Sequence, residues 1–139
     1  MSDAKKILEI IKDKDIQFVD LRFTDPRGKM QHVSQHVSTI DEDSLKEGFM
    51  FDGSSIAGWK AINESDMKLM PDCNRSIIDP FYSQPTMAIF CDVLDPLTNN
   101  PYERDPRSTA KQALEYMAKQ GIGDTAFFGP EPEFFVFDD

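Results

Sequence analysis

The alternation of apolar and polar residues predicts an α+β fold for the first hundred residues of the chain. Apolar residues at helical spacing follow the possible cap residues Ser2 and Asp3, so we expect an amphipathic helix that ends near Asp13. Two segments with strand-like alternation, residues 16–24 and 29–37, flank a turn that contains proline and glycine, which predicts a β-hairpin. The chain is therefore expected to begin with a helix followed by a hairpin.

Further elements are predicted after the hairpin. A cap at Thr39 or Asp41 predicts a short helix, which Gly48 can end. Strand-like runs follow at residues 66–70, 76–78 and 86–93. We therefore expect a mixed sheet with one or two helices.

The composition changes between residues 94 and 107, where three prolines and two adjacent asparagines interrupt every periodic pattern. Such a stretch is typical of a linker. Asp105 can cap the next helix, with Pro106 at its first position and Gly121 at its end. The expected buried face of this helix consists of Ala110, Ala113, Leu114 and Met117.

A helix that follows a linker predicts that a second domain begins near Arg104. The helix leads into residues 125–137, which we expect to form a strand. We therefore divide the chain into one domain at residues 1–103 and the beginning of another at residues 104–139.

Composition and charge narrow the class of protein. A chain of 139 residues with 40% apolar residues is long enough for about one domain with a buried core. The formal net charge of −10 repels phosphate backbones, so nucleic acid is not an expected partner. No stretch approaches the roughly 20 apolar residues of a membrane span, and we expect a cytoplasmic protein without a membrane partner.

The cysteines and histidines do not form a metal-binding motif. Cys73 and Cys91 stand alone, and we interpret them as reduced, half-buried thiols. His32 and His36 are four residues apart, but the segment around them alternates like a strand, so we interpret them as surface histidines.

Two carboxylates near the C-terminus are the first candidate site. If residues 129–137 are extended, Glu131 and Glu133 lie on the same side, about 6.6 Å apart along the strand. Two buried carboxylates require a cation or hydrogen-bond donors, and oxygen ligands suit Mg²⁺ or Mn²⁺. The alternative is an acidic strand end at a solvated edge, where Pro132 is tolerated.

The second candidate site is the loop at residues 51–59, which contains Asp52, two serines, two glycines and the only tryptophan of the chain. Asp52 could accept a proton or hold a cation while the serine hydroxyls position a polar substrate. The alternative is that Asp52 only caps a turn. The loop matches neither the glycine spacing of a dinucleotide fold nor a P-loop.

Five segments stand out in this order along the chain: FVDLRFTD at 18–25, MFDGSSI at 50–56, NESDM at 63–67, RDPRS at 104–108 and GPEPEFF at 129–135. Together they closely resemble bacterial type I glutamine synthetases. The segments extend over essentially the whole chain. The resemblance implies a small β-grasp-like N-terminal domain, followed by the first helix and strand of a much larger catalytic domain.

The resemblance also implies roles for five residues. Asp52 would bind ammonium and take its proton, and Ser55 would lie near that pocket. Trp59 would lie close to the ATP site. Glu133 would bind the metal that supports glutamate and ammonium binding, and Glu131 the metal that orients the ATP phosphates.

The implied activity is the ATP-dependent ligation of ammonia to glutamate through a γ-glutamyl phosphate, supported by two Mg²⁺ or Mn²⁺ ions per site. The implied assembly is a homo-oligomer of two stacked hexameric rings. The remaining site residues of the family would lie beyond Asp139, so we expect the chain to be an N-terminal fragment that is inactive by itself. The alternatives are a β-grasp module that binds partner proteins without catalysis, and a short regulator of the full enzyme.

Overall fold

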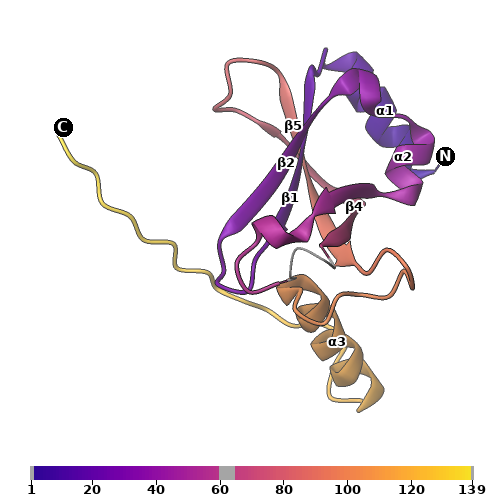
Figure 1. Cartoon of the computed structure of the whole chain (residues 1–139). Coiled ribbons are helices and arrows are strands. Elements are labelled where there is room, and N and C mark those ends of the chain that lie inside the picture. The colour runs from indigo at the N-terminus through magenta and orange to yellow at the C-terminus, as the bar shows by residue number, and fades with distance from the viewer. Residues whose placement is uncertain (1, 60–64, 139) are drawn as a thin grey trace.

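The computed structural model describes residues 2–59 and 65–138 and consists of a curved sheet, two helices packed on it and a third helix that follows (Figure 1). The elements are, in chain order, α1 (Asp3–Asp13), β1 (Phe18–Thr24), β2 (Met30–His36), η1 (Val37–Thr39), α2 (Glu42–Glu47), β3 (Phe49–Asp52), η2 (Gly53–Ser55), β4 (Asp66–Asp79), β5 (Thr86–Leu94) and α3 (Pro106–Lys119). The predicted α+β class with a mixed sheet is confirmed.

The helices begin and end where their cap residues predict. The Ser2 side chain accepts the Lys5 amide at the start of α1, and Asp41 forms a capping box at the start of α2. Gly48 ends α2 with φ of 88°, a conformation that glycine adopts without strain. Pro106 occupies the first turn of α3, as predicted.

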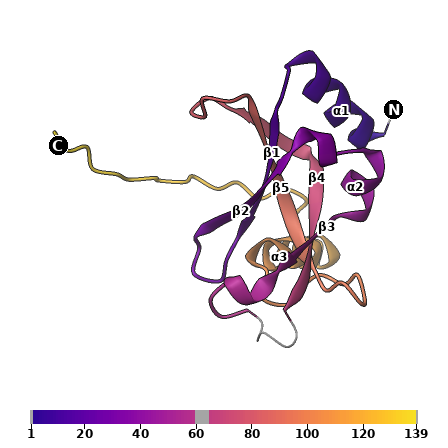
Figure 2. The same ribbon diagram turned by 45° about the horizontal axis from the view of Figure 1, so that its top comes forward.

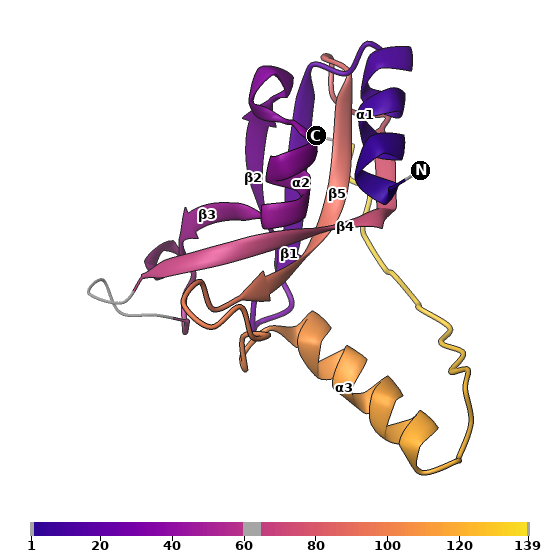
Figure 3. The same ribbon diagram turned by 90° about the vertical axis from the view of Figure 1, so that its right-hand side faces the viewer.

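The five strands lie in the order β2-β1-β5-β4-β3. The central strands β1 and β5 are parallel, and every other neighbouring pair is antiparallel. The two strands predicted at residues 66–70 and 76–78 are one strand, β4, whose pairing with β5 shifts between Pro71 and Ser76. Such an irregularity bends a strand without ending it, which explains why the pattern was interrupted (Figure 3).

The hydrophobic core lies between one face of the sheet and helices α1 and α2 (Figure 2). Alternate residues of β1 point into this core, so Val19 and Leu21 are fully buried. Cys91 on β5 is also buried, Cys73 is half-buried, and neither forms a disulfide. Burial raises the pKa of the Cys91 thiol, which keeps it protonated and unreactive.

The segment predicted to be a linker is ordered and partly buried. Backbone hydrogen bonds join Asp95 to Asn99 and Asn100, and the Tyr102 amide donates to the Val93 carbonyl. Tyr102 is 7% exposed. The connection is therefore ordered and joined to β5 by backbone hydrogen bonds, and its role as a linker between two domains stays a prediction.

The predicted buried face of α3 is also wrong in this structure. Ala110, Ala113 and Leu114 are exposed and Met117 is half-exposed, because α3 touches the sheet mainly through its first turn. None of the helices in the described ranges is long and apolar enough to cross a membrane.

The strand predicted at residues 125–137 is absent from this structure. Residues 124–138 run as an exposed chain away from the sheet, and the aromatic side chains of this segment are largely exposed (Figure 1). A strand forms only when a neighbour satisfies its backbone N–H and C=O groups, and no described strand pairs with this segment.

Candidate functional site

The loop after β3 presents an ionised carboxylate to solvent. Asp52 ends β3 and caps η2, where its Oδ1 accepts the Ser54 amide at 2.8 Å and the Ser54 hydroxyl at 2.6 Å. The Ser54 hydroxyl and amide hold the pKa of Asp52 below its ordinary value. Asp52 thus does cap a turn, and it also stays anionic and exposed, as a cation-binding group must.

Gly53 sets how closely the start of this loop approaches β4. Its amide donates to the Ser65 carbonyl at 2.7 Å, and a Cβ at this position would lie 2.4 Å from Cγ of Met67. Met67 is fully buried, so its side chain has little room to move. Glycine is therefore required here by contact with the core.

Replacing Gly53 by alanine should lower the free energy of unfolding by about 2 kcal/mol, because the added methyl group overpacks the buried Met67 side chain. Urea denaturation followed by the fluorescence of Trp59 measures this loss. The Gly123→Ala variant is the control, since a Cβ there meets no atom within 4 Å. Equal stability of the two variants would contradict the close contact.

The other end of the loop is buried. Trp59 is 6% exposed, and its ring packs against those of Phe23, Phe51 and Tyr102 at centroid distances of 5.5, 6.0 and 5.5 Å. Its indole Nε1 has no hydrogen-bond acceptor among the described residues. The indole is thus part of the aromatic core here, and its proximity to a nucleotide stays a prediction.

Ser55 is exposed at the end of η2, on the same short loop as Asp52. Two residues of the chain separate them, so both can face one small ligand. The structure places these two predicted residues together on the surface, whereas it does not place Glu131 or Glu133 beside them.

Glu131 and Glu133 lie on the exposed segment after α3. Within the described ranges, no group of three or more His, Cys, Asp or Glu side chains is arranged to hold a metal ion. Carboxylate oxygens are suitable ligands for Mg²⁺ or Mn²⁺, and proteins usually hold Mg²⁺ by one or two carboxylates together with waters and substrate phosphates. The two residues therefore fit part of a metal site and require further ligands.

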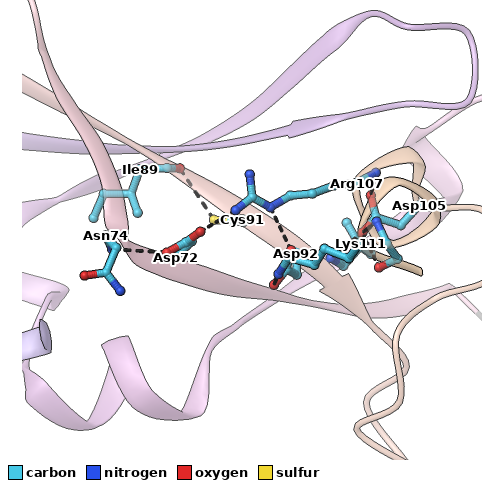
Figure 4. A network of polar contacts seen from close by, with 10 residues as sticks. Asp72, Asn74, Ile89, Cys91, Asp92, Asp105, Arg107 and Lys111 are labelled. Atoms are coloured by element: carbon cyan, nitrogen blue, oxygen red, sulfur yellow. Dashed lines mark hydrogen bonds and ion pairs between the residues drawn. The ribbon is translucent and has the colours of Figure 1, made fainter. Parts of the chain in front are cut away.

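Sequence reasoning missed an ionic network that fastens α3 to the sheet (Figure 4). Arg107 donates through Nε to Asp92 at 2.7 Å and through Nη2 to Asp72, and Lys111 contacts the other oxygen of Asp92 at 2.5 Å. The only sequence signal was the spacing of Arg107 and Lys111, four residues apart on one helix face.

A second missed network lies on the sheet face opposite the core. Asp20 is 1% exposed and accepts hydrogen bonds from Arg22 at 2.8 Å, His32 at 2.6 Å and Ser34 at 2.7 Å. Although burial alone would raise the pKa of Asp20, these three donors lower it. His32 and His36 are both exposed, so the prediction of surface histidines is confirmed. His32 is paired with the Asp20 carboxylate, whereas His36 lies beside Ser38.

Comparison with known proteins gives matches along the whole chain. The family described as "Glutamine synthetase, beta-Grasp domain" matches residues 15–96, and "Glutamine synthetase, catalytic domain" matches residues 103–139. The glutamine synthetase of Azospirillum brasilense is 63% identical over 139 residues, which are 100% of this chain and 30% of that relative. A relative from Cupriavidus pinatubonensis with a different name, 3-hydroxylaminophenol mutase, is 57% identical over 95% of this chain and 28% of its own length.

A solved structure supports the same relationship. The glutamine synthetase of Plasmodium falciparum superposes with a TM-score of 0.77 and 26% identity, over 87% of this chain and 23% of that one. The chain thus spans about 30% of the length of the curated relatives that it matches. With one family model covering residues 15–96 and a second following it, the chain belongs to the glutamine synthetase family.

Proposed function

We propose that this chain is the N-terminal part of an ATP-dependent glutamate-ammonia ligase. The observation that carries the proposal is the match of the whole chain to 30% of a glutamine synthetase, together with the β-grasp-domain match followed by the catalytic-domain match. We also propose the division into residues 1–103 and 104–139, which the catalytic-domain match over residues 103–139 supports. The alternative of a binding module without catalysis does not account for that second match.

In the proposed reaction, ATP phosphorylates the side-chain carboxylate of glutamate, and ammonia then displaces phosphate from the γ-glutamyl phosphate. Ammonium is almost wholly protonated at neutral pH and has no lone pair, so a base must remove a proton before attack. Asp52 is the residue of this chain that we assign to this step. Its exposed anionic carboxylate attracts the cation, and Ser55 on the same loop can contact the same small ligand.

Glu131 and Glu133 are proposed as the first ligands of two Mg²⁺ or Mn²⁺ ions. When bound, such ions neutralise the charge of transferring phosphate groups. The carboxylate chemistry of the two residues fits this role, and ligands from the rest of the protein would complete both shells. Trp59 is proposed to lie near the nucleotide.

The proposed setting is a cytoplasmic homo-oligomer of two stacked hexameric rings, with glutamate, ammonium and ATP as substrates. The acidic chain, with a net charge of −10, argues against nucleic acid as a partner. The experiment that tests the function is phosphate release by the full-length protein. Release that requires ATP, glutamate and ammonium together supports the ligase, whereas conversion of 3-hydroxylaminophenol without ATP would overturn it.

The 139-residue chain alone should release no phosphate from ATP in the presence of glutamate and ammonium. With one carboxylate for each of two divalent ions, the chain cannot hold both ions tightly, and without the ions the phosphate charge is not neutralised. A coupled phosphate assay on the purified chain, with the full-length protein as positive control, measures this. Substrate-dependent release by the chain would contradict the prediction.

A further inference from the structure

The segment that leads into α3 directly contacts the loop at residues 51–59, which is called the candidate loop below. Nη1 of Arg104 donates to the carbonyl oxygens of Gly58 at 2.7 Å and Trp59 at 3.3 Å. Two residues earlier, the ring of Tyr102 packs edge-on against that of Trp59 at 5.5 Å. Residues 45 positions apart in sequence therefore meet at the C-terminal end of the loop.

The loop at residues 51–59 is held at both ends and in its middle, where Ile56 is 7% exposed and belongs to the core, whereas Ser55, Ala57 and Gly58 are exposed. At its start, Gly53 donates to Ser65 next to β4. At its end, the guanidinium of Arg104 binds two successive carbonyl groups. Asp52 and Ser55 are both exposed. Ser55 lies between the Gly53 anchor and the buried Ile56, and Arg104 holds the chain just beyond Ile56, at Gly58 and Trp59.

The chemistry of arginine suits this contact. Its planar guanidinium offers several donors in a fixed arrangement, so it can hold neighbouring carbonyl groups in one geometry, whereas a lysine ammonium is a less directional donor. The ion pair of Arg104 with Glu103 is long, at 3.8 Å, and Glu103 is exposed, so this pair contributes little. Among the described residues, the carbonyl groups of Gly58 and Trp59 are therefore the principal contacts of Arg104.

The backbone that follows Arg104 is anchored to the sheet. Asp105 is fully buried and caps α3, and Arg107 joins α3 to Asp72 and Asp92 on the sheet (Figure 4). Arg104 is thus attached to a firmly anchored backbone and reaches from there to the loop. A donor on a fixed element is well suited to restrain a surface loop.

We propose that Arg104 is a positioning residue that fixes the loop at residues 53–59 and thereby places Asp52 and Ser55 for ammonium. The catalytic half of this inference, that Arg104 places Asp52 and Ser55 for ammonium, rests on the proposed function. The structural half, that Arg104 fixes the loop, does not. Arg104 itself need not touch substrate. Its effect is expected on the binding of ammonium more than on that of glutamate.

Hydrogen exchange of the 139-residue chain, measured by NMR, tests the structural half. The Ile56 amide donates to Gly53 and the Trp59 amide to Ile56, so both report loop opening. In Arg104→Met these two amides should exchange roughly tenfold faster, and in Arg104→Lys by an intermediate factor. The control is Arg27→Met, which removes an exposed arginine from the β1–β2 turn. Exchange in Arg104→Met equal to that of the control would overturn the proposal.

Kinetics of the full-length protein test the catalytic half. Arg104→Met should raise the KM for ammonium by roughly tenfold and leave the KM for glutamate within about twofold, with partial recovery in Arg104→Lys. An unchanged KM for ammonium, or equal changes for all substrates, would overturn the positioning role. If Asp52→Asn leaves the ammonium dependence unaltered, the proposed role of Asp52 fails, whereas the exchange rates still decide whether Arg104 holds the loop.

Discussion

The Asp52→Asn variant of the full-length protein is expected to lose about a hundredfold in kcat/KM for ammonium, which is within the usual range for removal of a catalytic acid or base. The asparagine oxygen can still accept the Ser54 amide, so the cap of η2 is kept while the negative charge is lost. The variant thus separates the electrostatic role of the residue from its role in the turn. Initial rates at varied ammonium, with glutamate and ATP saturating, measure the change.

Two further variants make this experiment specific. Asp52→Ala removes the cap as well as the charge, and should match Asp52→Asn in activity while being less stable by about 1 kcal/mol. Asp43→Asn removes an exposed carboxylate on α2 and should leave the kinetics unaltered. An ammonium dependence within twofold of the parent in Asp52→Asn would refute the assignment.

The lowered pKa of Asp52 indicates whether this residue contributes more to cation binding or to proton transfer. A carboxylate stabilised by two hydrogen bonds is a weak base, so its larger contribution is to attract a cation and hold it on the loop. Proton transfer to it becomes favourable as the attacking nitrogen gains positive charge. Loss of the charge should therefore raise KM for ammonium as well as lower kcat.

The sequence pattern predicted the helix caps and the hairpin, which are determined by residues close together in the chain. Of the caps left open, Ser2 rather than Asp3 begins α1, and Asp41 begins α2. The cap at Asp105 and the hairpin predicted from residues 16–24 and 29–37 are confirmed, because these features depend on neighbouring residues. The α+β class followed from the same periodicities. A turn such as the one at Asp52 is predictable in the same way, since its side chain bonds to an amide two residues later.

The errors arose where the outcome depends on distant residues. Whether residues 125–137 form a strand, or Leu114 is buried, is decided by the presence of a partner surface, about which the local pattern carries no information. The buried state of Tyr102 likewise depends on contacts with Trp59. The contact of Arg104 with the candidate loop joins positions 45 residues apart, and periodicity contains no signal for it.

Replacing Asp105 by alanine should give the largest loss of stability among the variants considered, about 3 kcal/mol. Asp105 is fully buried, and its Oδ2 accepts the Ser108 hydroxyl at 2.7 Å, the Ser108 amide at 3.2 Å and the Val93 amide at 3.3 Å. Its Oδ1 accepts the Arg107 amide at 3.1 Å. One side chain therefore caps α3 and joins it to β5.

The expected loss of stability has two sources, the missing helix cap and the buried Val93 amide that would lack an acceptor. Loss of a helix cap costs about 1 kcal/mol, and a buried amide without an acceptor costs about 1–3 kcal/mol. Val93 is fully buried, so water cannot easily replace the lost carboxylate at its amide. The melting temperature should fall by about 10 °C for a domain of this size.

The matched control for Asp105→Ala is Ser2→Ala, which removes an exposed cap from α1 and should lower the stability by only about 1 kcal/mol. Thermal and urea unfolding of the 139-residue chain, followed by Trp59 fluorescence, compare the two variants under the same conditions. If both lose the same amount, Asp105 acts only as a helix cap, and its bond to Val93 contributes nothing. A loss at least twice that of Ser2→Ala means that the carboxylate also holds α3 to β5, and through α3 the backbone from which Arg104 reaches the Asp52 loop.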